Sequence, residues 1–368
     1  MLLKDNEQMK KLLAAALTGA LMQAPAHAQT LDSLMSNIDF SFRGYGTIGT
    51  VRTNTNDALL TRGLENTGAG KSFFFGDDTN LGVQATARFT PWLSVTVQSL
   101  EDSGVLTELI NWAYVKLEPL DSLSIKVGRV ELPLFAISES RDINYANVWL
   151  RPPNEVYAMA NIEKLDGAQV TYSLPIGPTH LSLTGYTGNS VLAISEDTQY
   201  KTRDVRGGEV RWETPWATVR GGLTATNVQI QPGPNDVYTF ESVGVLMDRN
   251  HIVAQAEFVR RLSAHYASLS NANGWYVFGG YRVGTFVPYA SYAATNKTKP
   301  YDNELSVSGD QSTVALGVRW DAFKSADLKF QVERIDPRGS FGIDFVNEVP
   351  TFGSHHVTAF SATLDFVF

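Results

Sequence analysis

The feature that most constrains the fold of this chain is an alternation of apolar and polar residues that recurs along most of its length. In one such segment, Val83, Ala85 and Ala87 alternate with Gln84 and Thr86. Successive side chains of a strand point to opposite faces, so each segment predicts a strand with one apolar and one polar face. About sixteen segments of about ten residues follow this pattern, and no helix of credible length competes with them.

The connections between the predicted strands alternate in length along the chain. Short turns are expected near residues 90–92, 119–122, 175–178, 214–216, 248–250, 284 and 321–327. Mostly longer links are expected near residues 53–79, 103–106, 131–166, 188–204, 229–236, 263–273, 295–311 and 335–354. Such an alternation is typical of an up-and-down β-meander with one trimmed end and one elaborated end, as in membrane-spanning barrels.

Alternation alone also fits a soluble β-sandwich or propeller, in which the apolar faces point inward. The length of the strands favours the opposite arrangement, because soluble strands average about five or six residues. Arginines lie well inside the polar faces, where a dry core would penalise them and a water-filled lumen would solvate them. Aromatic residues mark the strand ends, as in the girdles of membrane barrels; they are Trp92, Trp212, Trp216, Trp275, Tyr281 and Trp320. The predicted fold class is all-β, a closed transmembrane antiparallel β-barrel.

The N-terminal residues predict export. Lys10 and Lys11 precede an apolar run over residues 12–22, and the small-residue site Ala26-His27-Ala28 follows. This pattern is that of a secretory signal peptide, with cleavage after Ala28, and the run is too short for a spanning helix. We therefore expect a signal peptide over residues 1–28 and a barrel over residues 29–368, with translation beginning at either Met1 or Met9.

Composition restricts the class of partner. Removing residues 1–28 removes three lysines and two acidic residues, which leaves 27 basic and 36 acidic residues and a net charge of −9. This balance argues against nucleic acid as a partner. The sequence contains no cysteine, so no disulfide framework stabilises the exported chain.

Residues 131–166 form the longest stretch without a steady period. The stretch combines three prolines and several aromatics with acids and arginines. Disordered segments are poor in aromatics, so an ordered functional loop is the better interpretation. Counting strands makes it the third link at the elaborated end of the barrel.

The C-terminus carries a resemblance to a known family. Phe360, Leu364, Phe366 and the terminal Phe368 share one face of the last strand. With the signal peptide, about sixteen strands and the long third loop, this resembles the Gram-negative outer-membrane porin family of the 16-stranded trimeric type. The resemblance implies a homotrimer in outer-membrane lipid, a third loop folded into the lumen as a constriction, and recognition of Phe368 by the barrel assembly machinery.

In such a pore, acids on the loop would face basic residues on the wall, and charges would select solutes by sign and size. Strand parity places the predicted pore-lining residues inward; they are Arg43, Arg88, Lys126, Arg211, Arg220, Arg282 and Arg319. The charged candidates on the constriction loop are Glu139, Arg141, Asp142, Arg151, Glu155 and Glu163. Alternatively, wall arginines pair with lumen acids and only hold the barrel; these acids are Glu209, Glu257 and Glu333. Arg129 breaks the parity of its strand, which predicts either a bulge at Gly128 or a position above the bilayer.

The predicted function is passive diffusion of small hydrophilic solutes and ions, without cofactor, metal or catalysis. One alternative is a channel selective for a small anionic or aromatic solute, bound by Arg141, Arg151, Tyr145, Trp149 and Tyr157. The same aromatics could instead pack the loop against the wall. A remote alternative is a barrel hydrolase using His180, His251, His265, His355 or His356, although no catalytic motif accompanies these histidines.

Overall fold

The computed structural model describes residues 38–61, 67–102, 110–160, 162–193, 199–231, 235–264, 270–299, 310–338, 343–347, 349, 352 and 355–368. The barrel belongs to a compact unit that begins at residue 40, except for Asp39 at the start of its first strand. The predicted signal peptide lies outside the described residues.

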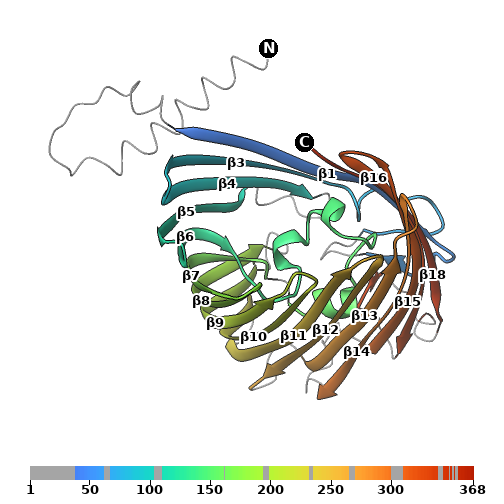
Figure 1. Cartoon of the computed structure of the whole chain (residues 1–368). Helices are drawn as coiled ribbons and strands as arrows, with labels where there is room; N and C mark the ends of the chain where they lie inside the picture. The colour runs from blue at the N-terminus through green and yellow to red at the C-terminus, as the bar shows by residue number, and fades with distance from the viewer. Residues whose placement is uncertain are drawn as a thin grey trace, which may run out of the picture. The chain divides into compact units, whose positions relative to one another are not determined.

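Sixteen strands close into an antiparallel barrel (Figure 1). They are β1 (Asp39–Thr53), β3 (Asn80–Thr90), β4 (Leu93–Asp102), β5 (Ile110–Leu120), β6 (Leu123–Glu131), β7 (Lys164–Ile176), β8 (Thr179–Ala193), β9 (Gln199–Glu213), β10 (Ala217–Gln231), β11 (Asn235–Arg249), β12 (Ile252–Ser263), β13 (Asn271–Tyr281), β14 (Phe286–Lys299), β15 (Asp310–Phe323), β16 (Ala326–Arg338) and β18 (Val357–Val367). Neighbours in sequence pair around the ring, and β18 pairs with β1. The predicted fold class and strand number are confirmed.

The predicted links are correct in order but not all in length. The link expected over residues 188–204 is wrong, because β8 continues to residue 193 and β9 begins at residue 199. The alternation breaks there because Asp204, at φ 53°, lies where the register between β9 and β10 shifts. At Arg129 the strand β6 pairs with β5 and β7 in continuous register, so the register shows no bulge of the kind predicted at Gly128.

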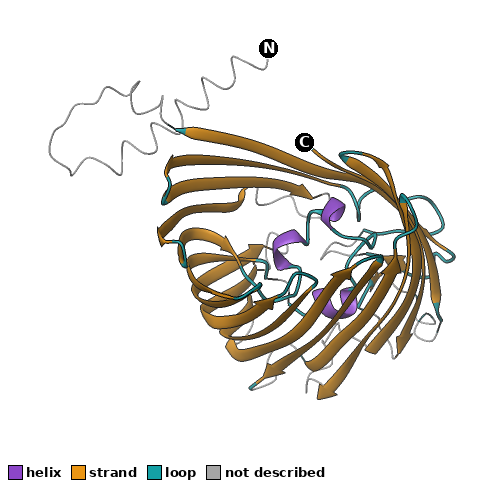
Figure 2. Ribbon diagram, in the orientation of Figure 1, coloured by secondary structure: helices purple, strands orange, loops and turns teal. Residues whose placement is uncertain are grey.

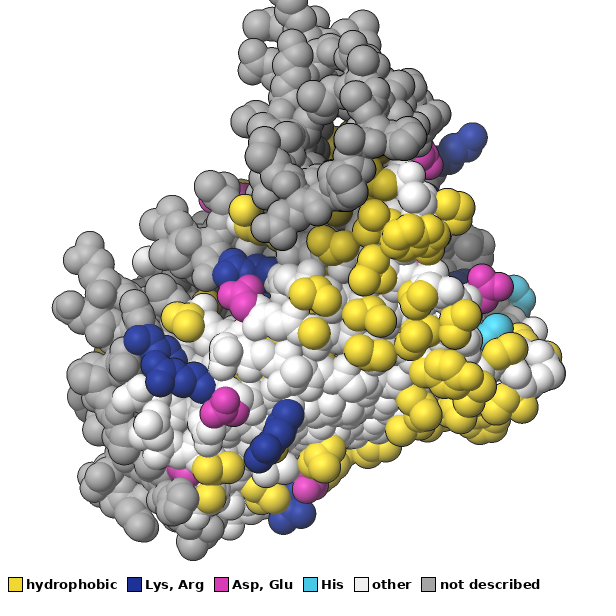
Figure 3. Space-filling model, turned by 90° about the vertical axis from the view of Figure 1, so that its left-hand side faces the viewer, with side chains coloured by type: hydrophobic (Ala, Val, Ile, Leu, Met, Phe, Trp, Pro, Cys, Tyr) yellow, Lys and Arg dark blue, Asp and Glu magenta, His cyan; other side chains and the backbone are white. Residues whose placement is uncertain are grey.

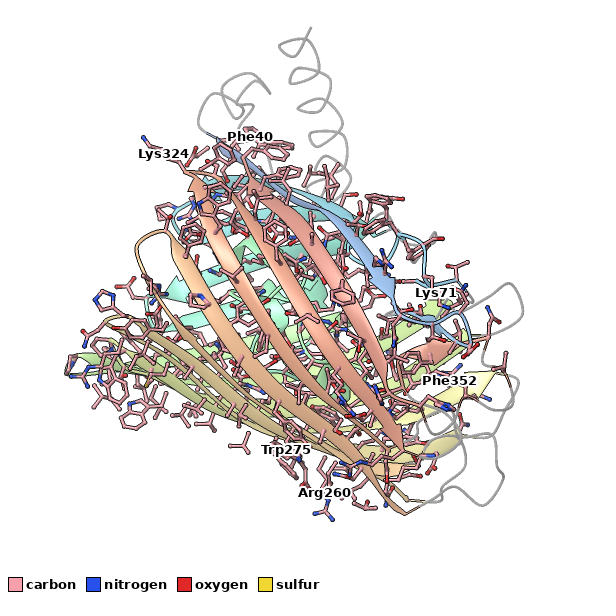
Figure 4. The ribbon with its side chains drawn as sticks, turned by 90° about the vertical axis from the view of Figure 1, so that its right-hand side faces the viewer. Phe40, Lys71, Arg260, Trp275, Lys324 and Phe352 are labelled. Carbon is pink, nitrogen blue, oxygen red and sulfur yellow. The ribbon has the colours of Figure 1, made fainter. Side chains whose placement is uncertain are left out.

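The outer face of the barrel carries the bulky apolar side chains. Large exposed residues include Leu183, Val210, Leu223, Val243, Leu316 and Phe330. Figure 3 shows such side chains gathered mainly toward one end of the surface. That end, here called the short-turn end, carries Phe40 and Lys324, whereas Lys71 and Phe352 lie at the other, the loop end (Figure 4). Exposed aromatics cluster near the short turns, namely Trp92, Trp212, Trp216, Tyr281, Phe286 and Trp320, as expected for an interfacial girdle.

Two further pieces of structure were not predicted. The strands β2 (Leu59–Leu60) and β17 (Phe345–Val346) pair across the first and last links at the loop end. The loop between β6 and β7 contains the short helices η1 (Ser138–Ser140), η2 (Asn144–Ala146) and α3 (Asn154–Tyr157). Among the described residues, no helix has the length and hydropathy that spanning a membrane requires.

The C-terminal residue takes part in the closure between β18 and β1. The amide of Phe368 donates to the carbonyl of Gly44 at 2.9 Å, and the amide of Gly44 donates to the carbonyl of Phe368 at 2.8 Å. The ring of Phe368 lies over Gly44, where a Cβ atom would come within 2.1 Å of it. Phe368 is 61% exposed, so most of its surface remains outside the packed wall.

Main-chain hydrogen bonds close the barrel at residue 368, and Phe368 is mostly exposed. Phe368→Ala should therefore clearly reduce the fraction of newly made protein that assembles, and it should lower the melting temperature of the folded protein only slightly. Phe360→Ala is the matched control, since Phe360 lies on the same strand and is 50% exposed. Assembly yield is measured from the membrane fraction of expressing cells. An equal yield for the two variants would contradict a role of Phe368 in assembly.

Candidate functional site

The loop between β6 and β7, residues 132–163, lies inside the barrel and is here called the inserted loop. Figure 2 shows its short helices within the ring of strands. Its contacts with inward side chains of strands distant in sequence confirm the predicted insertion. Several groups of polar contacts and one apolar cluster hold it.

The first anchor is Arg220 of β10, whose side chain is completely buried. Its guanidinium donates to the carbonyls of Pro133 and Leu134 at 2.9 and 3.0 Å. It also pairs with Glu209 at 2.7 Å and with Glu257 at 3.4 Å. Glu257 accepts a 2.7 Å hydrogen bond from the amide of Ala136 in return. One guanidinium and one carboxylate of the wall therefore fix the beginning of the loop.

The second anchor points from the loop to the wall. Arg151 binds Asp78 through two nitrogens and Glu333 at 2.5 Å, and donates to Ser361 at 2.7 Å. Burial alone would lower the pKa of the Arg151 guanidinium, but the two carboxylates outweigh burial and raise it. Removing one partner of such a buried ion pair costs about 3–5 kcal/mol.

The third anchor holds the middle of the loop with two wall cations. Arg319 donates to the carbonyls of Tyr145 and Asn147 at 2.7 and 2.9 Å. Lys329 donates to the carbonyl of Asn144 at 2.6 Å. Carboxylates flank both cations: Asp327 lies 3.1 Å from Arg319, and Asp365 lies 2.9 Å from Lys329.

Aromatic side chains of the loop pack against inward aromatics of the wall. Trp149 makes edge-to-face contacts with Tyr276 and Phe278, at centroid distances of 5.3 and 5.1 Å. Phe135 makes another with Phe240 at 5.3 Å. These rings belong to the largest buried apolar cluster of the described residues.

The helix α3 approaches the wall at a glycine. A Cβ atom at Gly274 of β13 would lie 2.2 Å from the carbonyl oxygen of Glu155. Only glycine permits this approach, because the obstructing atom belongs to the main chain and cannot swing away. The position of α3 against the wall therefore depends on Gly274.

Two buried carboxyl groups meet where α3 reaches the loop end. Glu155 accepts hydrogen bonds from Gln311, at 2.8 Å, and from Thr313. Asp344, beside β17, accepts from Gln311 and Asn154 at 2.7 and 2.6 Å. Burial, followed by the charge of Asp344, raises the pKa of Glu155 to about 7. The pair thus joins the inserted loop to the last link of the barrel.

The predicted pore-lining cations fall into two groups. Arg220 and Arg319 hold the loop, as described above. Arg211 pairs with Glu209 at 2.8 Å, and Arg282 pairs with Asp248 at 2.6 Å. Arg282 and Arg319 line a cavity of about 460 Å³ at the short-turn end.

The second group lies on the wall strands nearest the N-terminus. Arg43 shares the face of buried Tyr45, and Arg88 shares the face of Gln84 and Thr86, which bond to β4. Lys126 lies over the ring of Tyr114, 5.3 Å from its centroid. The register aligns Arg88 with Ser94, Ser94 with Lys116, and Lys116 with Lys126. Arg88, Lys116 and Lys126 are here called the basic row; within it, Lys116 also contacts Glu118 at 2.7 Å.

The charged loop candidates do not form one acidic surface. Glu139 is exposed, and Arg141 pairs with Glu163 at 2.8 Å. The main-chain carbonyl of Asp142 accepts from Asn80 at 3.1 Å. Arg151 and Glu155 are buried between loop and wall, as are Trp149 and Tyr157. These four side chains therefore support the packing interpretation rather than a solute site.

Several anchoring residues escaped the sequence analysis. Lys329 and Arg261 lie on the inward faces of their strands, so parity could have found them; Arg261 donates to the carbonyl of Met159 at 2.9 Å. Asp78 lies in an aperiodic link and gives no signal. Among the described residues, no cluster of acidic residues, histidines or cysteines could hold a metal ion; His265 lies outside that part of the chain.

Gly274→Ala should displace α3, because a methyl group would collide with the carbonyl of Glu155. We expect a lower melting temperature in detergent and an altered single-channel conductance, since overpacking typically costs about 1–3 kcal/mol. Gly279→Ala on the same strand is the control, because no atom lies within 4 Å of its Cβ position. Equal melting temperatures and equal conductances for the two variants would contradict the close approach of α3 to Gly274.

The raised pKa of Glu155 predicts a pH effect on stability. An acid whose pKa rises on folding destabilises the folded state as pH rises from its unfolded value, 4.5, toward about 7. Wild-type protein should therefore lose melting temperature over this range more steeply than Glu155→Gln, whose amide mimics the protonated acid. Glu139→Gln, an exposed loop acid, should follow wild type. Parallel curves for wild type and Glu155→Gln would refute the coupling.

Comparison with known proteins relies on structure. No family model and no curated protein matches the sequence. The outer membrane channel DcaP of Acinetobacter baumannii matches with a TM-score of 0.61 and 11% identity, covering 90% of this chain and 98% of that one.

Two other solved structures agree. An anion-selective porin from Comamonas acidovorans has a TM-score of 0.59 and 11% identity, with coverage of 90% and 100%. The trimer form of OmpT, an outer membrane protein of Vibrio cholerae, has a TM-score of 0.56 and 12% identity, with coverage of 90% and 99%. This chain therefore has the 16-stranded barrel fold of the Gram-negative outer-membrane porins.

Proposed function

We propose that the protein is an outer-membrane channel for passive diffusion of small hydrophilic solutes and ions. The observation that carries the proposal is the inserted loop, which lies inside a closed barrel whose outer face is apolar and whose inner face is polar where the loop does not pack against it. Polar pairs line the inner face of the N-terminal half, such as Thr171 with Thr184 and Ser173 with Ser182, both at 3.0 Å. A solute would pass between the loop and this wall, and the loop would set the size limit.

The apolar outer face and the aromatic girdle support a position in outer-membrane lipid after export. A homotrimer is the proposed assembly, on the analogy of the trimer form known for Vibrio cholerae OmpT. The barrel assembly machinery is the proposed partner during insertion, with Phe368 as the recognised residue.

A preference for small anions is the second candidate, and the basic row favours it. Lys116 and Lys126 lie directly opposite each other on the lumen face. Like charges in such a pair repel, so an anion beside them is stabilised. The net charge of the mature chain, −9, would favour cations instead, but several acids beside the loop already pair with arginines; they include Glu209, Glu257 and Glu333. The anion-selective porin of Comamonas acidovorans shows that this fold supports such selectivity.

Recording in planar bilayers tests both candidates. Purified protein should give a stable, ohmic conductance in KCl, and its absence would refute the channel. In a KCl gradient, the reversal potential should indicate anion preference, and Lys116→Gln/Lys126→Gln should shift it toward cations. Lys324→Gln, at a short turn on another part of the barrel, is the control. Conductance without that shift would refute the anion preference alone.

A further inference from the structure

Three cations gather on the outer face of β9 near the loop end. Lys201 aligns with Val191 of β8, which is 46% exposed on the outer face. Arg203 and Arg206 align with Asn227 and Ala225 of β10, on the same face as the exposed Leu223. No ion pair holds any of the three cations among the described residues. Lys201, Arg203 and Arg206 are here called the outer basic cluster.

A β-bulge brings the two arginines to one face. Asp204 and Val205 together oppose the single residue Thr226, so Arg203 and Arg206 both point outward although they are three positions apart. Val205 points inward and is completely buried. Without the bulge, one of the two arginines would point into the barrel.

Side chains of both neighbouring strands fasten this bulge. Asn189 of β8 accepts a 3.0 Å hydrogen bond from the amide of Asp204. Asn227 of β10 donates a 3.0 Å hydrogen bond to the Asp204 carboxylate. The positive φ of Asp204 is thus held from both sides. Bulges of this kind often redirect a functional side chain.

The cluster lies at the margin of the apolar band. Trp212 of the same strand belongs to the aromatic girdle at the short-turn end. A strand tilted by about 40° gains about 2.5 Å of height per residue, so the three cations lie roughly 15–25 Å above Trp212. An apolar band is about 25 Å tall. Lys201 and Arg203, at the upper end of this range, are therefore at the level of the lipid headgroups on the loop side, and the long side chain of Arg206, roughly 15 Å above Trp212, can reach toward them from within the band.

We propose that the outer basic cluster binds the phosphate groups of a phosphorylated lipid headgroup at the loop side of the membrane. Cations near a membrane surface attract anionic lipids, and guanidinium groups bind phosphate through paired hydrogen bonds. The cluster continues the lipid-facing surface of β8–β10. The proposal is independent of the channel function.

The test measures binding of dye-labelled, diphosphorylated lipid A to the full-length protein in neutral detergent micelles, by fluorescence anisotropy. The variant Lys201→Gln/Arg203→Gln/Arg206→Gln should bind about a hundredfold more weakly than wild type. Added salt should weaken wild-type binding. Circular dichroism checks that the variant retains its strand content.

Two controls make the result specific. Arg43→Gln/Arg88→Gln/Lys126→Gln removes the same charge from the lumen and should bind like wild type, and lipid A without phosphates should bind wild type weakly. Equal losses in both triple variants, or equal binding of phosphate-free lipid, would overturn the proposal. So would a variant that binds lipid A normally but loses its oligomeric state, because the cluster would then contact another copy.

Discussion

The inserted loop depends on buried cations that bind carboxylates and main-chain carbonyls at the same time. A charge removed from water is stabilised only where opposite charges and hydrogen-bond partners replace the water. Arg220 meets this condition with Glu209, Glu257 and two loop carbonyls. Lys329 meets it with Asp365 and the carbonyl of Asn144. These contacts stabilise the loop as well as the cations. A loop without regular structure would otherwise leave its main-chain carbonyls without hydrogen-bond donors.

This arrangement makes the inner wall asymmetric. The cations of β10, β15 and β16 are engaged by the loop, whereas the basic row on β3, β5 and β6 belongs to a wall of polar pairs. A solute in the lumen would therefore meet packed protein on one side and accessible charge on the other. On the proposed function, selectivity would depend less on the number of charged residues than on which of them the loop has already neutralised.

Strand periodicity predicted most of the fold and only part of the site. The alternation shows which residues share a face, and this was enough for sixteen strands and the inward direction of Arg220 and Arg319. It does not show partners across the lumen. Arg151 binds Asp78 and Glu333, which are 73 and 182 positions away, and Asp78 lies in an aperiodic link. The role of Gly274 likewise becomes clear only from its contact with α3. A glycine can occur in a strand for many reasons, so the sequence alone does not reveal this one.

Departures from the two-residue period are where this barrel differs from a plain β-cylinder. The longest departure, residues 132–163, becomes the inserted loop. A shorter one at Asp204, which the sequence pattern assigns to a long link, is a bulge inside a continuous pair of strands. Both departures redirect charged side chains, the first into the lumen and the second onto the outer face. The regular strands supply a closed wall, and the interruptions decide which charges face the lumen and which face the outside of the barrel.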